Sequence, residues 1–255
     1  MKVRSTQIAT FKQCPAKAYY RYELGLRKKN TSKGVDLLFG SMLHDAIDAF
    51  HTTEDARAGL DVINSTELPF DKIKNQANGR ALYVKYVKEN PIQVISSEKS
   101  FSFKIGNHDW VGRFDGVGKF NGLLYVLEHK TTKPMYLQTK PNDQFIAYWA
   151  GALIFYNDIS GIIINSLDPT KIALERIFVN YSREEFYEWR DEMKATIEYY
   201  VRCRTKGSFP RHPFSCKMFN RQCIFHEICS EPAVSRQTII NMLYEEDKQS
   251  KELSW

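Results

Sequence analysis

The fold is decided by residues 112–130, which read Gly-Arg-Phe-Asp-Gly-Val-Gly-Lys-Phe-Asn-Gly-Leu-Leu-Tyr-Val-Leu-Glu-His-Lys. The Asn121-Gly122 pair near the centre favours a tight two-residue turn between antiparallel strands. Such a turn places Asp115 directly opposite Glu128 on one face of the hairpin. Lys130 shares that face because it lies two residues further along the strand. The stretch therefore predicts a hairpin that carries two carboxylates and a lysine side by side.

A preceding strand extends the row of acids. The Gly106-Asn107 pair is a second turn signal, and a two-residue loop there places Glu98 opposite Asp115. Carboxylates in a row repel one another, so they cannot all stay ionised without a compensating charge. Carboxylate and carbonyl oxygens suit Mg²⁺ or Mn²⁺, and an added imidazole favours Mn²⁺. The pattern predicts a divalent-metal site, with a surface hairpin of scattered charges as the alternative.

Helices are predicted on either side of this three-stranded meander. Ser5 or Thr6 caps a helix that reaches about residue 24 and ends at Gly25. Residues 52–91 are polar and are interpreted as a helical insertion away from the functional site. The order of the elements predicts an α/β fold with a central mixed β-sheet flanked by helices. Further helices are expected over 36–51, 71–89, 141–157 and 182–204, and further strands over 161–164 and 173–180.

Length and composition fit a single domain. The chain has 255 residues, 43% hydrophobic and 26% charged, which excludes a largely disordered chain, a collagen-like repeat and a coiled coil. The longest nearly apolar run, residues 147–156, is about half the length of a membrane helix. The first residues lack the apolar stretch of a secretory signal, so we expect a cytoplasmic, reducing location. Residues 245–255 are expected to form a polar tail.

Basic residues concentrate near the N-terminus. Residues 12–33 contain seven Lys or Arg and one acid, Glu23, interleaved with tyrosines. Cations that meet phosphates and rings that meet bases are typical of nucleic-acid binding. A solvated helix face with its tyrosines in the core is the alternative. The residues predicted to contact DNA are Lys17, Tyr20, Arg21, Arg27, Lys28 and Lys29.

Cysteines gather near the C-terminus. A reducing compartment argues against disulfides, so grouped thiols predict a metal centre. Zinc is one candidate, because four thiolates, or three with His212 or His226, complete a tetrahedral site. Cys203 falls within the helix expected over 182–204 and is interpreted as an ordinary, partly buried thiol. The candidate ligands are Cys216, Cys223 and Cys229, together with Cys14 far upstream.

Taken in order, these motifs resemble those of the RecB-like nucleases of the PD-(D/E)xK superfamily, which include CRISPR-associated and bacteriophage exonucleases with an iron–sulfur cluster. The resemblance covers nearly the whole chain and implies a restriction-endonuclease-like core. It also implies that the cluster joins residues 1–30 to residues 205–232. The motifs are the Cys-Pro of the opening helix, Gly40-Ser41-Met42-Leu43-His44, Gly112-Arg113-Phe114-Asp115, Glu128-His129-Lys130 and Gln144-Phe145-Ile146-Ala147-Tyr148.

The resemblance implies a role for each motif. Lys130 would orient the attacking water and offset charge that builds on the phosphate. Gln144 and Tyr148, one helical turn apart, would reach the DNA backbone or the catalytic lysine. The implied metal ligands are His44, Asp115, Glu128 and the main-chain carbonyl of His129, with Glu98 as an additional ligand or an outer neighbour.

The cysteines acquire a role in the same way. In the resembling nucleases, one N-terminal and three C-terminal cysteines hold a 4Fe-4S cluster, which implies Cys14, Cys216, Cys223 and Cys229 here. The six-residue gap after Cys216 departs from the two-residue gap common in the family, and zinc stays the alternative.

The function implied is that of a Mg²⁺- or Mn²⁺-dependent DNA exonuclease that prefers single-stranded ends. It would act in recombination, repair or CRISPR-type DNA processing, beside a helicase, integrase or recombination partner, with self-association open and no membrane partner. The alternative is a non-catalytic DNA-binding or recombination accessory protein that keeps the fold. An electron-transfer protein would leave the row of carboxylates without a role.

Overall fold

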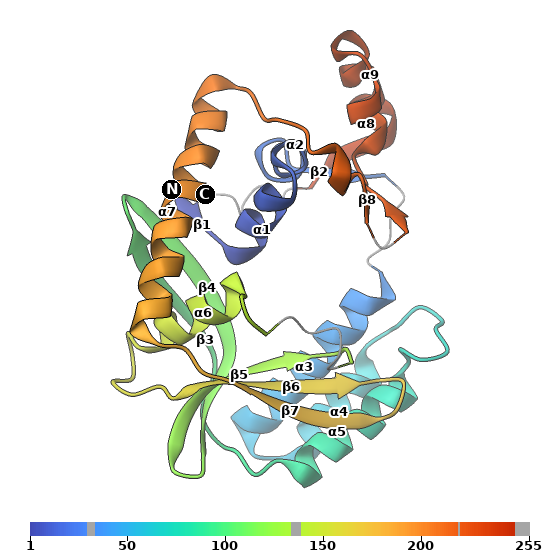
Figure 1. Ribbon diagram of the computed structural model, residues 1–255. Helices are drawn as coiled ribbons and strands as arrows, with labels where there is room; N and C mark the ends of the chain where they lie inside the picture. Colours follow the sequence, from blue (N-terminus) through green and yellow to red (C-terminus); the bar gives the residue numbers. More distant parts are fainter. Residues whose placement is uncertain (30–33, 134–138, 219, 248–255) are drawn as a thin grey trace. The chain divides into compact units, whose positions relative to one another are not determined.

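The computed structural model describes residues 1–29, 34–133, 139–218 and 220–247. The chain divides into two compact units, which are described separately. The sheet unit comprises residues 33–101 and 112–186, and the cysteine unit comprises residues 1–32, 102–111 and 187–255. Figure 1 follows the chain through both units by colour.

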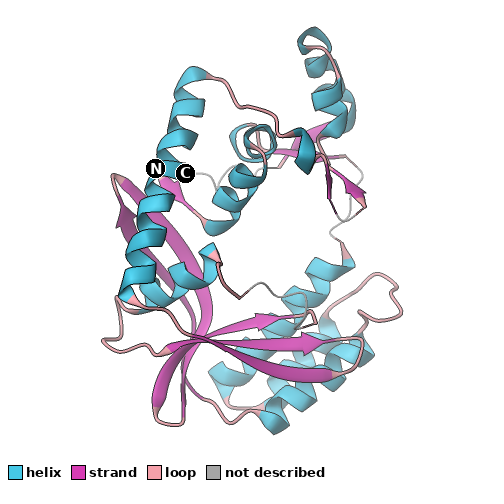
Figure 2. Cartoon of the chain, in the orientation of Figure 1, coloured by secondary structure: helices cyan, strands magenta, loops and turns pink. Residues whose placement is uncertain are grey.

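The sheet unit is built on a mixed β-sheet. Its order is β4-β5-β6-β7, with β3 paired to β4. The β5–β6 pair is parallel, whereas β4–β5 and β6–β7 are antiparallel, which confirms the predicted mixed sheet (Figure 2). Strands β3 and β4 also contribute residues to the cysteine unit. The strands are β3 Gln93–Ile105, β4 His108–Phe120, β5 Leu123–Lys130, β6 Gly161–Asp168 and β7 Ala173–Val179.

The central hairpin forms in the predicted register. Asn121 and Gly122 both have positive φ, as a tight turn of this type requires. The β4–β5 ladder then runs from Phe120 opposite Leu123 to Gly116 opposite Leu127. This register brings Asp115 and Glu128 to the same end of the hairpin.

Helices lie on both faces of this sheet. Helix α6 Asp143–Ala152 contributes Gln144, which bonds Glu128, and α5 Gln76–Glu89 contributes Tyr86, whose ring contacts His129. Because successive residues of a strand point to opposite faces, α6 and α5 cover opposite sides of β5. Helices α3 Val35–Thr53 and α4 Ala56–Ser65 pack with α5, and the arrangement confirms the α/β fold with flanking helices (Figure 1).

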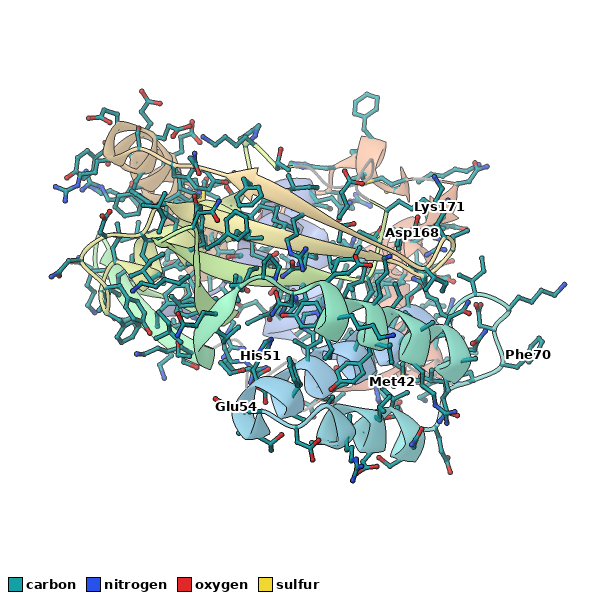
Figure 3. The ribbon with its side chains drawn as sticks, turned by 90° about the horizontal axis from the view of Figure 1, so that it is seen from below. Met42, His51, Glu54, Phe70, Asp168 and Lys171 are labelled. Carbon is teal, nitrogen blue, oxygen red and sulfur yellow. The ribbon has the colours of Figure 1, made fainter. Side chains whose placement is uncertain are left out.

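Residues 52–91 contribute more to the core than their polar composition predicts. Ile63 of α4 and both Leu82 and Tyr83 of α5 are almost fully buried against α3. The clearest helix of this region begins at Gln76, five residues later than predicted, because the Asn75 side chain caps it there. Figure 3 shows α3 with Met42 and, at its C-terminal end, His51 and Glu54.

Two other predicted helices differ in their limits. The helix expected over 5–24 is divided into α1 Ser5–Gln13, α2 Pro15–Ala18 and a π-helical turn at Tyr19–Glu23. Pro15 disfavours a helical conformation at the residue before it, and Cys14 is extended there. Arg4 rather than Ser5 or Thr6 precedes the first turn.

Helix α6 is shorter than the predicted 141–157. Pro141 lies before the helix and not in its first turn, because the Asn142 side chain accepts hydrogen bonds from the Gln144 and Phe145 amides and sets the start. Helix α7 Arg183–Lys206 agrees closely with the predicted 182–204.

The cysteine unit contains most of α7 and the chain's N- and C-terminal segments. Its strand β10 Tyr244–Glu246 pairs with β2 Leu26–Lys28, and β1 Lys2–Val3 pairs with the start of β4. Glu23 accepts a hydrogen bond from Tyr200 of α7 (2.6 Å), so the N-terminal segment and α7 share one core. The other short elements are η3 Pro213–Ser215, β8 Lys217–Met218, β9 Arg221–Gln222, α8 His226–Ser230, η4 Ala233–Ser235 and α9 Arg236–Leu243.

Within the described part of the chain, no helix combines the length and the hydrophobicity needed to cross a bilayer.

Candidate active site

Glu128 is the centre of a hydrogen-bonded group at the end of β5. It is only 2% exposed, and its Oε1 lies 2.5 Å from Lys130 Nζ and accepts from Gln144 Nε2 at 3.0 Å. Its Oε2 is buried and has no hydrogen-bond partner among the described residues. A buried carboxylate oxygen without a partner is costly, so this atom is suited to a ligand that the protein itself does not supply.

Helix α6 brings its two predicted residues to this carboxylate. The Asn142 cap starts the helix so that Gln144 faces β5, and Tyr148 lies one turn further on the same face. Gln144 Nε2 also lies 2.9 Å from the Tyr148 hydroxyl, and Gln144 Oε1 lies 3.4 Å from Lys130 Nζ. Gln144 therefore connects Glu128, Lys130 and Tyr148.

Helix α3 supplies the histidine on the Asp115 side. Gly40 allows α3 to approach the end of β5 closely, because a Cβ on this residue would lie only 3.3 Å from Thr131 Oγ1. One turn later, His44 Nδ1 lies 3.3 Å from Asp115 Oδ1. The other carboxylate oxygen, Asp115 Oδ2, accepts from the main-chain N–H of His129 at 2.7 Å.

The two carboxyl groups have opposite electrostatic environments. Burial raises the pKa of Asp115, but the hydrogen bond and charge of His44, together with the His129 N–H, outweigh it and leave the pKa well below its usual value. Burial and the charge of Asp115 raise the pKa of Glu128, against the opposing effect of Lys130. Burial lowers the pKa of His44, but Asp115 outweighs it and leaves the pKa above its ordinary value.

The chemical groups of Asp115 and Glu128 are suited to bind a divalent cation. A positive ion would compensate the mutual repulsion of Asp115 and Glu128 and would give Glu128 Oε2 a partner. In the conformation described, Lys130 is bound to Glu128 and His44 to Asp115. Within residues 1–29, 34–133, 139–218 and 220–247, no three His, Cys, Asp or Glu side chains are grouped closely enough to hold a metal ion.

Glu98 lies near this group but bonds elsewhere. It lines a cavity of about 10 Å³ together with His44 and Asp115. Its carboxylate accepts from Arg113 Nη1 at 2.7 Å, and its backbone has φ 33°, which departs from the regular extended strand assumed in the prediction. Glu98 therefore stands beside the site as a partner of Arg113.

The predicted DNA-contacting residues are largely engaged within the cysteine unit. Tyr20 is 7% exposed and packs on Phe225. This agrees with the alternative interpretation, in which the tyrosines of residues 12–33 lie in the core. Lys28 pairs with Glu227, and Arg27 pairs with Glu245 at 2.9 Å. The remaining partners are Gln13 for Lys17, the Asn241 carbonyl for Lys29 and the ring of Tyr22 for Arg21.

The four candidate cysteines lie in one neighbourhood of the cysteine unit. Burial raises the pKa of Cys223, and the thiols of Cys14 and Cys216 raise it further. Burial and the thiols of Cys14 and Cys223 act in the same way on the pKa of Cys229. Cys203, in contrast, is buried beside Phe11 and Tyr200, as expected for an ordinary thiol.

Sequence reasoning missed a group of polar residues behind the site. Asn165 and Ser166 are buried in β6, and the Asn165 amide lies 3.2 Å from His129 Nδ1. Tyr86 and His51 continue the group, with the Tyr86 hydroxyl 2.8 Å from His51 Nε2. The available signal was the polar Asn-Ser pair directly after the apolar run of residues 161–164.

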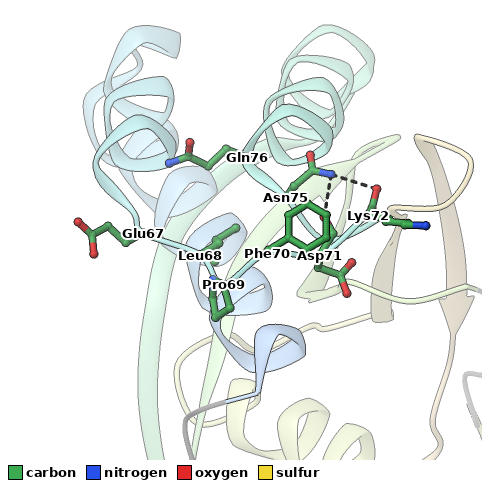
Figure 4. Close-up of a pocket in the computed structure, with 8 residues that line it drawn as sticks. All are labelled: Glu67, Leu68, Pro69, Phe70, Asp71, Lys72, Asn75 and Gln76. Atoms are coloured by element: carbon green, nitrogen blue, oxygen red, sulfur yellow. Dashed lines mark hydrogen bonds between the residues drawn. The ribbon is translucent and has the colours of Figure 1, made fainter.

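A larger pocket lies apart from these residues. The loop between α4 and α5 forms a surface pocket of about 790 Å³ whose wall includes Leu68, Phe70 and Gln76 (Figure 4). Its described lining contains none of the residues predicted for catalysis or metal binding. This pocket is therefore separate from the place where the carboxylates meet.

Comparison with known proteins identifies the family. The sequence profile described as "PD-(D/E)XK nuclease superfamily" matches residues 5–230. No curated protein matches the chain. Among solved structures, the chain is similar to the protein named "Putative exonuclease" from Eubacterium rectale, with a TM-score of 0.57, 11% identity and 92% of each chain covered. A protein named SSO0001 aligns with a TM-score of 0.39 and 16% identity, over 90% of this chain and 85% of that one. With a profile match across almost its whole length, the chain belongs to the PD-(D/E)XK nuclease superfamily.

Proposed function

We propose that this chain is a metal-dependent DNA exonuclease that hydrolyses phosphodiester bonds. The observation that carries the proposal is the buried Glu128 carboxylate, which has Lys130 on one oxygen and no partner among the described residues on the other. Asp115 and His44 lie close enough to influence the pKa of this carboxyl group. A stabilising role alone would not favour a buried acid in this arrangement, because an unpartnered oxygen costs free energy of folding.

Each residue has a definite task in this reaction. Asp115, Glu128, His44 and the His129 carbonyl would hold Mg²⁺ or Mn²⁺, which when bound polarises the scissile phosphate and lowers the pKa of a water. Asp115 is prepared for this task because its pKa is held low and its carboxylate is ionised at neutral pH.

Lys130 and Gln144 would act on the substrate side. Lys130 Nζ is a compact cation that can orient the attacking water and offset negative charge on the phosphate. Gln144 holds Lys130 and Glu128 in their relative positions through its amide oxygen and nitrogen. Tyr148 supports Gln144 through its hydroxyl.

Replacement of Lys130 tests the proposal. The parent chain with Mn²⁺ or Mg²⁺ should degrade end-labelled DNA, and EDTA should stop it. Lys130→Ala should lower the rate by at least about 100-fold while the protein stays folded, because removal of one group that stabilises transition-state charge costs roughly that much. Lys85→Ala is the matched control, since Lys85 pairs with Glu89 on the surface of α5. Equal degradation by Lys130→Ala and the parent chain would contradict the assignment, and so would a parent chain that binds DNA without cutting it.

The exonuclease mode is supported by the family and by the name of the structural neighbour from Eubacterium rectale. It is tested on 5′-blocked and 3′-blocked oligonucleotides, single-stranded and duplex. We expect a block at one end to stop digestion, with single strands degraded faster. Cleavage of circular single strands at the rate of linear ones would contradict an exonuclease.

We also propose that a 4Fe-4S cluster is held by Cys14, Cys216, Cys223 and Cys229. Thiolates are the ligands that such clusters use, and Cys223 and Cys229 pack in the same cluster as Cys14. The thiols of Cys14 and Cys216 both raise the pKa of Cys223 and of Cys229. A pocket of about 560 Å³ opens beside Cys216 and Cys229. Bound there, the cluster would connect segments from the two ends of the chain.

Iron analysis and unfolding test the cluster. Anaerobically purified protein should be brown, with about four irons per chain. Cys223→Ala should lose iron and lower the melting temperature by more than about 4 °C, the shift that 1–2 kcal/mol produces in a chain of this size. Cys203→Ala, which alters a thiol outside the group, should keep its iron. Zinc in place of iron would overturn the assignment.

A further inference from the structure

Asn165 is a buried polar residue in a position where its neighbours are apolar. It lies in β6 with no exposed surface, directly beside His129 in the parallel β5–β6 ladder. Two residues earlier on the same face, the corresponding pair is Leu127 and Ile163, which are both buried hydrophobic residues. Polar side chains thus replace apolar ones just where β5 reaches the candidate active site.

The contact between these two side chains is direct. Asn165 Nδ2 lies 3.2 Å from His129 Nδ1, and it donates to that nitrogen in this arrangement. The His129 ring is also held edge-on against Tyr86, with ring centroids 5.4 Å apart at 89°, and against His44 at 5.8 Å and 83°. The imidazole is therefore fixed from three directions.

His129 matters to the site through its main chain. Its N–H donates to Asp115 Oδ2 at 2.7 Å, and under the proposed function its carbonyl is a metal ligand. The β4–β5 ladder extends only to Leu127, so on that side His129 has Asp115 in place of a strand partner. The β6 side must therefore supply much of the restraint on this part of β5.

A contribution to stability does not explain Asn165. Its Oδ1 is buried without a hydrogen-bond partner among the described residues, which lowers the free energy of unfolding relative to an apolar side chain of similar shape. A buried polar residue with this cost points to a task other than stability.

We propose that Asn165 is a positioning residue, which fixes the His129 side chain and thereby sets its main-chain N–H against Asp115 and its carbonyl toward the cation. The inference rests on the proposed metal-dependent function, and it predicts that Asn165 governs the affinity for the cation without contacting it. Residues that orient metal ligands in this way typically change metal affinity by roughly 10–100-fold when they are replaced.

The test is the binding of Mn²⁺, measured by electron paramagnetic resonance of free Mn²⁺. Asn165→Leu keeps the number and branching of the side-chain heavy atoms and removes the hydrogen bond, and it should weaken Mn²⁺ binding by at least about 10-fold. Ile163→Val is the matched control, because it removes a buried methyl group from the same strand and face at a position paired with Leu127 rather than with His129. It should change Mn²⁺ affinity by less than about twofold, as expected when only packing changes.

His129→Ala provides a second, independent variant. It keeps the main-chain groups but removes the side chain that Asn165 holds, so it should weaken Mn²⁺ binding to a similar extent. In the His129→Ala background, Asn165→Leu should have no further effect, because the two residues act through one contact. A further loss of Mn²⁺ affinity when Asn165→Leu is added to His129→Ala would overturn the inference, and this comparison does not require the single Asn165→Leu variant to fold.

The outcomes separate this inference from the proposed function. Asn165→Leu that binds Mn²⁺ as tightly as Ile163→Val overturns the positioning role, while DNA degradation by the parent chain would still stand. A parent chain that binds Mn²⁺ but cuts no DNA overturns the nuclease function, while a 10-fold loss in Asn165→Leu would still support the positioning role. A parent chain without any Mn²⁺ affinity overturns both.

Discussion

At the scale of single residues, the site depends on how neighbouring groups give two similar carboxyl groups different pKa values. Asp115 receives a histidine and a main-chain N–H, whereas Glu128 is buried beside Asp115 with a lysine as its main compensation. The same chemical group is therefore held ionised at one position and pushed toward its protonated form at the other. Binding of a cation would remove this difference, because its charge favours the ionised form of both.

His51 gives a pH-dependent prediction at this scale. Burial lowers its pKa to about 4, against the opposite effect of Asp48. The pKa of histidine in an unfolded chain is about 6.5, so between these values the unfolded state binds the proton more readily. The stabilisation from neutral His51 is therefore fully present above about pH 6.5 and is lost as the pH falls toward 4.

Urea unfolding between pH 7 and pH 4.5 measures this effect. In His51→Gln, the free energy of unfolding should fall less steeply with acidification than in the parent chain, because an amide does not titrate. The Gln side chain can keep the hydrogen bond that His51 Nε2 makes with Tyr86. A fall of equal steepness in both proteins would show that His51 does not contribute.

At the scale of elements, local sequence signals predict most helix and strand boundaries. The main difference from the prediction is the helix expected over 5–24, which is interrupted before Pro15. Helix start and stop signals predict one helix through the Cys-Pro sequence, yet Cys14 is extended and separates α1 from α2. The rule that disfavours a helical residue before proline accounts for the break. Because Pro15 follows it, Cys14 lies outside both helices, and its thiol is near those of Cys223 and Cys229.

The crossing of α3 and α4 gives a second prediction. A Cβ on Gly59 would lie 2.2 Å from the Tyr83 hydroxyl and 2.5 Å from the Ala46 carbonyl oxygen. Gly59→Ala should therefore destabilise the protein by about 1–3 kcal/mol, the usual cost of overpacking, because the backbone of α3 cannot move away easily. The measurement is the urea midpoint at constant m-value.

Gly34→Ala is the matched control for this change. Among the described residues, its two chain neighbours aside, no atom lies within 4 Å of a Cβ built on Gly34, so the substitution should lower the midpoint much less than Gly59→Ala does. A loss of stability in Gly34→Ala equal to that in Gly59→Ala would indicate a general effect of glycine replacement rather than a steric one at the helix crossing.

At the scale of the whole molecule, motifs that are far apart along the chain lie together in the same unit. His44, Asp115, Glu128 and Gln144 come from α3, β4, β5 and α6, and all four lie in the sheet unit. The cysteines that follow α7 share the other unit with Cys14. Segments distant in sequence therefore lie together in one unit or the other, and the family profile over residues 5–230 includes parts of both units.

The sequence by itself determined the hairpin, the mixed α/β class and the approximate helix ranges, because turn chemistry and hydrophobic periodicity act between residues that are close in the chain. The register followed from the Asn121-Gly122 turn, and it placed Asp115 and Glu128 at the same end of one hairpin. Only the tertiary structure decided that Asn165 meets His129 and that Tyr86 covers it from α5. These contacts depend on which buried faces pack together, and packing between distant segments follows from the shape of the whole core rather than from any local pattern.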